Sequence, residues 1–496
     1  MTTGRGLKHG VRARLLEPVA YILGFVLIGV GTAMLAAAGV GLIYSEFNEA
    51  TWIAVAAAIT VATGLILARQ IGKPAPITVK IGFAAVGLSW FVISAFGSLP
   101  FLLTGSIDTV TNAYFETASG FTTTGATILP DPSVLPQSLL FWRSATHWLG
   151  GMGVIVLSVA ILPLLGTGGV QLARAESTGH MPDRLTPRFR DTAKRLWLLY
   201  VVFTIVQALL LWAGEMNLFE SITHTFSTVS TGGFGTRPDS IAGFSAYSQW
   251  VITGFMFVAG ASFALHWRAV RRPSEYWNSA EFRLYVLITT IAVIIVAGGL
   301  LRDLPPGEAF RHAAFTTVSV ITTTGFTTEN YGAWRPALQV AVFGLMFIGG
   351  MAGSTAGAVK TFRIGILSKA AISDIRRLVH PRGVFTLRFG RERVSESTVE
   401  AIQSFFLFYM FIFMTATFLT TFIDANLSER LDLVSAASSV AATLGNVGPG
   451  LGAVGPAGSY AELPDLVKWL QSGLMIIGRL EIFPVLVLFT RDLWRR

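Results

Sequence analysis

The sequence has no cysteine among its 496 residues, and charged residues make up only 13% of it. The missing cysteine excludes disulfides, thiolate catalysis and cysteine-ligated metals, and it leaves the redox compartment undetermined. Soluble domains carry about 25% charged residues, so this chain has too few charges to cover a soluble surface. These absences, with 52% hydrophobic residues, indicate a membrane protein without a sizeable soluble domain.

Long apolar runs account for this composition. A membrane-spanning helix needs about 20 predominantly apolar residues. Ten segments are long enough, at residues 18–43, 51–68, 78–103, 137–165, 196–214, 246–266, 284–301, 336–352 with a continuation beyond 358, 401–423 and 466–490. The first run is too long for a cleaved signal peptide. We therefore expect an all-α polytopic membrane protein.

The basic residues gather on one side of these spans. Most of the 37 Lys and Arg residues precede residue 15 or lie within 69–80, 174–195, 268–283, 360–393 and 491–496. By the positive-inside rule this side is cytoplasmic, as are both termini. The opposite loops are acidic, which either concentrates cations or only keeps the loops solvated. The basic segments 174–195 and 360–393 leave room for anionic lipid or a soluble partner.

Four connections on the acidic side contain a short apolar segment that cannot span a membrane. Each ends in small and hydroxyl residues around a glycine. The segments are 112–121, 219–229, 308–321 and 431–442, and the glycines are Gly125, Gly232, Gly325 and Gly445. One Thr-Thr-Gly triplet is a weak signal, but four in the same topological position are a strong one.

Each interval between these glycines holds one inward and one outward span, so the repeating unit is helix, re-entrant loop, helix. A two-span unit begins every copy on the same side, which gives parallel repeats instead of the inverted repeats of many transporters. We expect four such repeats around a central pore, at residues 76–190, 191–278, 279–395 and 396–496, after a two-helix extension at residues 1–75.

The loop composition fits a cation filter. Non-helical backbone at membrane depth is tolerated where it is buried or lines a wet cavity. Glycine permits positive φ, which turns carbonyls toward one axis, and carbonyl rings replace the hydration shell of potassium. The residues expected to bind K⁺ are Thr123, Thr124, Gly125, Ser230, Thr231, Gly232, Thr323, Thr324, Gly325, Thr443, Leu444, Gly445 and Asn446.

These motifs resemble those of the bacterial Trk-type potassium uptake subunits, within the Trk/Ktr/HKT superfamily, over nearly the whole chain. The likeness includes residues 147–153, residues 349–357 and the two spans before the first repeat, which Ktr-type subunits lack. It implies potassium uptake across the bacterial inner membrane and a homodimer. It also implies control by a separate cytoplasmic ring that binds a nucleotide, NAD or ATP.

Residues 349–358 interrupt an apolar run. Their small side chains fit either close helix packing or, as the resemblance implies, an intramembrane gate loop beneath the filter. The residues expected to form the gate are Gly349, Gly350, Gly353, Ser354, Thr355, Gly357 and Arg479.

Arg479 lies within the last apolar run, where a charge marks a functional site by default. It is either a positive barrier facing the pore or part of a structural ion pair. Glu481 is a poor partner for it, because residues two apart on a helix do not face each other.

The other candidate sites give weaker evidence of function. Glu116 is expected to be buried and hydrogen-bonded behind the filter, not an ion ligand. Residues 450–455 match GxGxxG but follow a pore loop instead of a strand, so we expect no nucleotide site in this chain. No Walker motif is present, which excludes a pump ATPase, and nucleic acid is not an expected partner. The histidines share no ligand spacing; they are His147, His224, His266 and His312.

Two function classes remain open. One is a gated, channel-like pore, and the other is a symporter coupling potassium to protons or sodium, which needs a titratable or sodium-binding group within the bilayer. The charged mid-span candidates are few: Glu116, Arg143, Arg479 and Glu481. A membrane enzyme would need His, Asp or Glu clustered at one level, and no such cluster is present. Sodium-selective relatives look to carry serine at the first filter glycine, so Gly125 favours potassium over a sodium/potassium permease.

Overall fold

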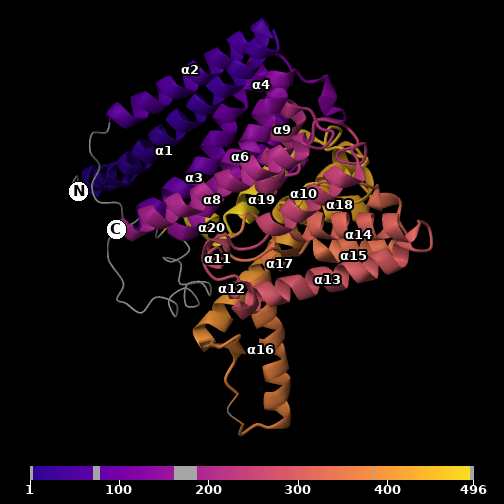
Figure 1. Ribbon diagram of the computed structural model, residues 1–496. Coiled ribbons are helices and arrows are strands. Elements are labelled where there is room, and N and C mark those ends of the chain that lie inside the picture. Colours follow the sequence, from indigo (N-terminus) through magenta and orange to yellow (C-terminus); the bar gives the residue numbers. More distant parts are fainter. Residues whose placement is uncertain (1–3, 71–78, 161–186, 384, 492–496) are drawn as a thin grey trace.

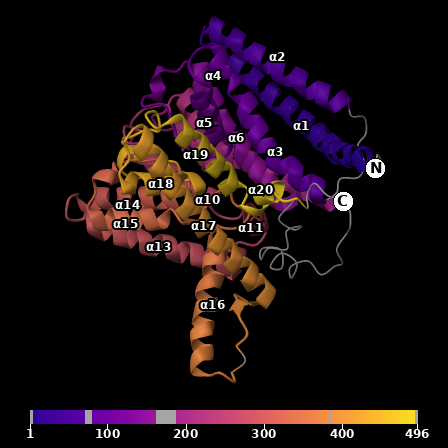
Figure 2. The same cartoon turned by 180° about the vertical axis from the view of Figure 1, so that it is seen from behind.

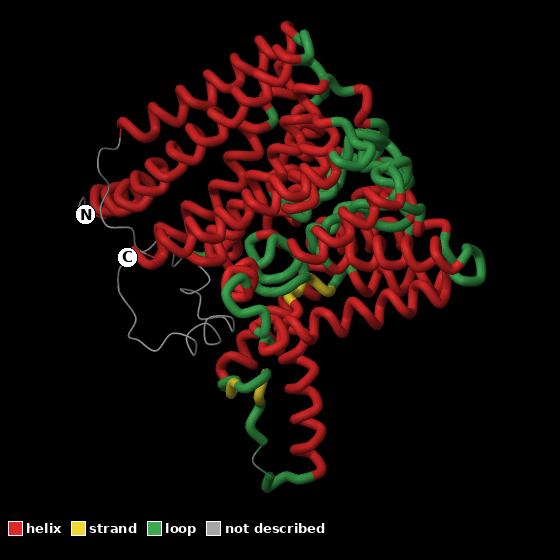
Figure 3. The backbone as a smooth tube through the Cα atoms, in the orientation of Figure 1, coloured by secondary structure: helices red, strands yellow, loops and turns green. Residues whose placement is uncertain are grey.

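The computed structural model describes residues 4–70, 79–160, 187–383 and 385–491, and most of this part of the chain is helical (Figure 3). The described strands are two residues long: β1 (Ile348–Gly349) pairs with β2 (Val359–Lys360), and β3 (Arg388–Phe389) pairs with β4 (Glu392–Arg393). The expected all-α class is confirmed. Residues 161–165 of one expected span and most of the basic segment 174–195 lie outside the described residues.

An N-terminal hairpin lies along one flank of the molecule (Figure 1). It consists of α1 (Gly4–Ile43) and α2 (Phe47–Gln70). The two backbones touch at small residues, since a Cβ added to Gly64 would lie 2.6 Å from the carbonyl oxygen of Gly24. Such contacts through small residues are typical of membrane helices.

The other helices follow in four successive groups. The first contains α3 (Val79–Gly97), α4 (Leu99–Leu103), α5 (Val110–Phe121), η1 (Pro132–Val134) and α6 (Gln137–Ala160). The second contains α8 (Pro187–Trp212), α9 (Leu218–Val229), α10 (Ala246–Ala259), α11 (Phe263–Ala269) and α12 (Glu275–Asn278). The third contains α13 (Ala280–Leu300), α14 (Pro306–Ile321), η3 (Tyr331–Ala333), α15 (Pro336–Leu345) and α16 (Thr361–Val379). The fourth contains α17 (Glu396–Leu427), α18 (Leu433–Leu444), η4 (Gly452–Val454), α19 (Asp465–Arg479) and α20 (Phe483–Leu488).

Each group has one short buried helix, and we call α5, α9, α14 and α18 the inner helices. In α14, every residue from 312 to 321 is buried. Polar N-caps set where three of them begin: the side chains of Thr109, Asn217 and Asp432 accept backbone N–H groups of the first turn. Because protein surrounds the inner helices, they can carry Ser and Thr where a lipid-facing helix carries Leu and Phe.

Among the described residues, six helices are long and apolar enough to cross a membrane: Glu17–Ile43, Phe47–Arg69, Lys80–Leu103, Asp191–Trp212, Ala280–Leu300 and Glu396–Leu427. Ten spans were expected, one of them interrupted at residues 349–358; in the structure the second span of the second, third and fourth groups is broken. Helices α10 and α11 meet at 97°, α15 stops at Leu345, and α19 stops at Arg479 before α20 begins. The sequence indicated the interruption at residues 349–358, but not the breaks between α10 and α11 and between α19 and α20.

Helix α16 and the β3–β4 hairpin project away from the helical body (Figures 1 and 2). Much of the basic segment 360–393 lies on this projection. Its outer half is exposed, including Leu378 and Val379. Its first turn is buried, including Thr361 and Arg363.

Candidate functional site

The four inner helices end in the same hydrogen-bond pattern. At α5, the N–H of Thr124 donates to Ser119 O (2.9 Å), and that of Thr123 donates to Gly120 O (3.1 Å). This pair of bonds defines a Schellman C-cap, in which one residue adopts the left-handed conformation and is usually glycine. The left-handed residues are Thr123 (φ 50°), Thr231 (φ 56°), Thr323 (φ 55°) and Asn446 (φ 55°).

Three of these left-handed residues are threonines. A β-branched residue with positive φ is a genuine steric outlier. Such strain persists only where surrounding structure over-determines it, and it clusters at functional sites. Its recurrence at the ends of three inner helices therefore marks the loops that follow as the candidate site.

Two residues after each left-handed residue stands a glycine that also has positive φ. These four glycines are Gly125 (82°), Gly233 (81°), Gly325 (84°) and Gly448 (99°). The expected equivalence of Gly232 and Gly445 with Gly125 is therefore wrong. Gly232 comes one residue early, and Gly445 is the C-cap of α18 with φ −81°. The first glycine of a loop does not mark the same position in every loop. The equivalent position is set by the left-handed residue, which is a threonine or an asparagine and not a glycine.

The four positive-φ glycines close a ring between the loops. A Cβ added to Gly125 would lie 2.2 Å from Gly232 O, far inside contact distance. The other three glycines meet carbonyls in the same way: Gly233 at 1.9 Å from Thr324 O, Gly325 at 2.2 Å from Val447 O, and Gly448 at 2.6 Å from Thr124 O. Each loop thus packs its glycine against the next loop's carbonyl, and the fourth loop returns to the first.

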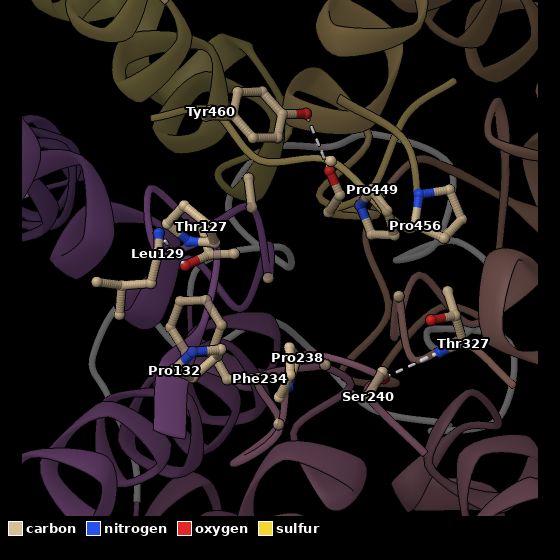
Figure 4. Close-up of a pocket in the computed structure, with 18 of the residues that line it drawn as sticks. Thr127, Leu129, Pro132, Phe234, Pro238, Ser240, Thr327, Pro449, Pro456 and Tyr460 are labelled. Carbon is tan, nitrogen blue, oxygen red and sulfur yellow. Dashed lines mark hydrogen bonds between the residues drawn. The ribbon is translucent and has the colours of Figure 1, made fainter. Parts of the chain in front are cut away.

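A cavity of about 80 Å³ opens beside this ring and includes all four positive-φ glycines in its lining. Figure 4 shows its walls, formed by the loop residues that follow the glycines. Tyr460 donates its hydroxyl to Gly448 O (3.0 Å), and Ser240 accepts the N–H of Thr327 (3.2 Å). These bonds hold the loops around an open centre.

Glu116 lies behind the first loop, as expected from the sequence. Its carboxylate is 1% exposed and accepts hydrogen bonds from the Thr127 hydroxyl (2.9 Å), the Ile128 N–H (2.9 Å) and Arg143 Nε (2.6 Å). The Arg143 guanidinium stacks on Phe234 at 3.5 Å from the ring centroid. This buried pair braces the first two loops against each other.

The Glu116 position differs in every group. Counting seven residues back from each left-handed residue gives Glu116, His224, Thr316 and Ser439. His224 bonds Glu220 O through Nδ1 (2.8 Å). The support behind the ring is therefore different in each loop, although the loop backbones are alike.

Residues 349–358 form a loop between α15 and α16. Its two stems pair as β1 and β2. On the way, Met351 N–H donates to Gly260 O (2.9 Å) and Gly353 O accepts the N–H of Phe263 (3.0 Å). These bonds attach the loop to the α10–α11 bend.

The far end of loop 349–358 lies directly against the ends of the inner helices. Gly357 donates its N–H to the Thr323 hydroxyl (2.7 Å), and a Cβ on Gly357 would lie 2.4 Å from Gly445 O. Thr355 donates its hydroxyl to Val229 O (3.2 Å), at the C-terminus of α9. The loop therefore covers the side of the ring opposite the cavity.

Arg479 reaches this loop from the end of α19. It is 4% exposed, and its Nη1 donates to Thr355 O (2.6 Å). Within the described residues, its Nε and Nη2 have no hydrogen-bond partner. Glu481 pairs with Arg363, as its poor placement relative to Arg479 suggested.

Three charged residues at the loop stems escaped the sequence prediction. Lys360 and Arg363 were expected to be cytoplasmic topology determinants, but they are only 6% and 3% exposed. Lys360 Nζ donates to Ala356 O. Glu281 accepts the N–H groups of Ala352 (2.7 Å) and Phe362. Their closeness in sequence to the loop, or to the start of an apolar helix, is the signal that could have found them.

The remaining candidates have structural contacts. His147 bonds Gly120 O (2.7 Å) and stacks on Phe234, and His266 bonds the Tyr276 hydroxyl (2.7 Å). The GxGxxG match at 450–455 contains the short η4 turn. No group of three His, Asp or Glu residues in the described part of the chain could hold a metal ion.

A family model described as "TrkH: Cation transport protein" matches residues 48–495. A Trk system potassium uptake protein TrkH of Vibrio parahaemolyticus is 41% identical over 424 residues, covering 84% of this chain and 86% of the relative. The TrkH of Halomonas elongata is 38% identical over 492 residues, covering 97% of this chain and 100% of the relative.

The fold has a solved counterpart. The crystal structure of the potassium transporter TrkH from Vibrio parahaemolyticus superposes with a TM-score of 0.89 at 36% identity. The match covers 97% of this chain and 100% of the solved one. These relatives are transport proteins by description.

Proposed function

We propose, from the premise that this chain belongs to the TrkH family of cation transport proteins, that it takes up potassium through a gated, channel-like pore. The observation that carries the proposal is the closed ring in which four glycines pack against four carbonyls. Such a ring is what a filter made of backbone oxygens requires.

The proposed filter consists of the residues from each left-handed residue to the following glycine. These are Thr123, Thr124 and Gly125; Thr231, Gly232 and Gly233; Thr323, Thr324 and Gly325; and Asn446, Val447 and Gly448. Ser230, Thr443, Leu444 and Gly445 belong to the ends of the inner helices. There, α9 and α18 direct the partial negative charge of their C-termini toward the inner end of the filter.

Loop 349–358 is the proposed gate. Its bonds to Thr323 and Thr355's bond to Val229 put it across the inner end of the filter. These contacts support a closed state of the proposed pore, in which the loop backbone lies in the path of a cation that leaves the filter. Opening would require the loop to leave these partners.

Arg479 adds an electrostatic barrier at the same level. A unit positive charge about 6 Å from a permeating cation, at an effective dielectric of ~20, opposes it by roughly 3 kcal/mol. That corresponds to about a hundredfold in occupancy or rate, because each ~1.4 kcal/mol is tenfold. The guanidinium Nε and Nη2, which have no hydrogen-bond partner in the described part of the chain, also favour a hydrated space beside Arg479, since buried donors normally find water.

The ion pairs of the two mid-span carboxylates named from the sequence favour a channel over a symporter. Glu116 is held by Arg143, and Glu481 by Arg363. A carboxylate that shuttles protons or binds sodium must be released from its partner in each cycle, at a cost of several kcal/mol for a buried pair. Neither carboxylate is therefore well placed to couple transport to a second ion.

The partners follow from the family likeness. We expect a homodimer in the bacterial inner membrane with both termini cytoplasmic, contacts with membrane lipid, and regulation by a soluble nucleotide-binding ring of the Trk type. The basic projection of α16 would then lie on the cytoplasmic side. No organic cofactor is expected in this chain, and K⁺ is its permeant ion.

Flux measurements in liposomes test the proposal. Purified protein should pass K⁺ and Rb⁺ better than Na⁺ when driven by a membrane potential alone. Flux that requires a proton or sodium gradient would instead establish a symporter. Arg479→Ala, and deletion of part of residues 353–357, should each raise basal flux without the regulatory partner; monodisperse variants with unchanged flux would remove both from the ion path.

A further inference from the structure

The segment that follows α19 has an unusual backbone. Ile482 N–H donates to Ile477 O (2.9 Å), and Glu481 N–H donates to Gly478 O (3.1 Å). These two bonds form a Schellman C-cap with Glu481 as the left-handed residue, at φ 56°. Glycine normally fills that position because it carries no Cβ penalty. A glutamate there is strained and needs another reason to be present.

A second strained turn follows at once. Phe483 N–H donates to Glu481 O (2.8 Å), and Ile482 between them has φ 67° and ψ −63°. This is the positive-φ form of the γ-turn, which is rare and strained. A β-branched residue increases the steric strain of such a turn, and Ile482 is fully buried. Two consecutive non-glycine residues with positive φ persist only if their surroundings hold them.

The side chain of Glu481 supplies that hold. Its carboxylate pairs with Arg363, two residues after the start of α16. The Arg363 guanidinium lies over the Phe405 ring at 3.9 Å from its centroid. Glu481 is thereby fixed to the C-terminal stem of loop 349–358 by a part-buried ion pair.

The last residue of α19 contacts the far end of the same loop. Arg479, two positions from Glu481, donates to Thr355 O (2.6 Å). Residues 479–482 therefore contact loop 349–358 twice, at its tip through Arg479 and at its stem through Glu481. Arg479 is the last residue of α19, so the anchor at Glu481 fixes the end of the helix from which Arg479 extends.

We propose that residues 479–482 form a strained latch on the gate, in which Glu481 is the positioning residue that anchors the end of α19 and so holds Arg479 at Thr355. The ion pair with Arg363 holds the two turns in their strained form. When the pair breaks, the backbone relaxes and Arg479 leaves the loop, so the two contacts open together. This inference rests on the proposed gating role of loop 349–358.

The absence of native cysteine permits a direct test. Ser354→Cys introduces one thiol into the loop at a position that is 1% exposed, and its labelling rate by a polar maleimide in liposomes reports loop opening. Glu481→Gln and Arg479→Gln are made in this background, singly and together. Each single variant should label about tenfold faster, the scale of one charge-assisted hydrogen bond. The double variant should be no faster than either single variant, since coupled residues are not additive.

Matched variants separate the latch from general destabilisation. Glu462→Gln breaks the exposed Arg430 pair and should leave labelling unchanged, while Arg363→Gln breaks the latch pair from its other side and should act as Glu481→Gln does. Ile482→Gly should label more slowly than Ile482→Ala, because both lose the same buried side chain but only glycine relieves the strained φ.

Wild-type labelling in Glu481→Gln and Arg363→Gln, or multiplied effects in the Glu481/Arg479 double variant, would overturn the latch. So would equal labelling rates in Ile482→Gly and Ile482→Ala. Labelling does not require ion permeation. Coupled labelling without Rb⁺ flux would therefore support the latch and refute the transport proposal, whereas Rb⁺ flux with uncoupled labelling would do the reverse.

Discussion

Gly448→Ala tests the assignment of the filter in the fourth repeat. Gly448 has φ 99°, and its added Cβ would lie 2.6 Å from Thr124 O. Alanine would therefore meet two penalties at once, a left-handed backbone and a collision with a carbonyl of the first loop. The Cβ is bonded directly to the backbone and would meet a backbone carbonyl, so no flexible side chain can move to relieve the collision.

The backbone penalty alone is about 1–2 kcal/mol for a residue with a Cβ. If relaxation displaces the Thr124 carbonyl from the ring, a comparable loss should appear in ion discrimination. A loss of one or two kcal/mol is a factor of about 5–30. We expect the preference for Rb⁺ over Na⁺ in liposome uptake, measured in competition, to fall by that factor in Gly448→Ala.

Gly445→Ala is the matched control in the same loop. Gly445 has φ −81°, and the equivalent positions in the other three loops carry side chains, namely Thr122, Ser230 and Thr322. Its Cβ would lie 2.8 Å from Ala441 O and 3.0 Å from Met346 O, and the equivalent side chains in the other loops contact the corresponding carbonyl of their own helices. Selectivity should therefore survive in Gly445→Ala. The reverse outcome, with Gly448→Ala selective and Gly445→Ala not, would refute the ring described above.

Three further predictions concern the same scaffold. Gly125→Ser should weaken potassium preference in the same flux competition, because its Cβ would lie 2.2 Å from a neighbouring carbonyl; full discrimination would contradict the ring. Glu116→Ala leaves Arg143 buried without its partner and should cost about 3–5 kcal/mol, seen as a lower melting temperature in detergent; an unchanged melting temperature would show that the pair contributes nothing. The pKa of Asp432 lies below its ordinary value because the Ser435 side chain and N–H bond its carboxylate, so Asp432→Ala should cost about 1 kcal/mol near neutral pH. That difference should shrink as the pH falls below about 4, the pKa of an unfolded aspartate; a difference constant down to about pH 2 would exclude ionisation as its origin.

Hydropathy and charge were sufficient for the membrane class and for the placement of four loops. The threonine triplet Thr122–Thr124 is followed by Gly125, and a second threonine triplet precedes Gly325 in the same way. In those two repeats the expected glycines have the conformation assigned to them. Glu116 was also placed correctly, because a carboxylate inside an apolar segment must find donors.

In the second and fourth loops the positive-φ glycine could not be identified from the sequence, because each loop contains two candidate glycines. Gly232 and Gly233 are adjacent, and Gly445 and Gly448 flank Asn446. A sequence does not reveal which residue bears the left-handed conformation when threonine takes it against its preference. The structure resolves this through the C-cap hydrogen bonds, which depend on tertiary packing around the helix ends.

The break between α19 and α20 was not evident from the sequence for a related reason. The run through residues 479–482 reads as apolar apart from Arg479 and Glu481, with no proline or glycine at the turn itself. The bend is held by an ion pair to Arg363, more than a hundred residues earlier. A partner so far away in sequence cannot be identified from a local pattern.

The divergence behind the ring, from Glu116 to His224, Thr316 and Ser439, has a consequence for how such a pore can evolve. In a ring of four identical chains, every mutation enters four times, and four carboxylates would crowd behind one filter. A single chain admits each mutation once. The same rule applies to the proposed Arg479 barrier: one charge would oppose a cation about 6 Å away by roughly 3 kcal/mol, whereas four at that distance would oppose it by roughly 11 kcal/mol. Regulatory couplings between sites are typically only about 1–3 kcal/mol, so joining the repeats in one gene keeps the barrier within the range that a partner protein can switch.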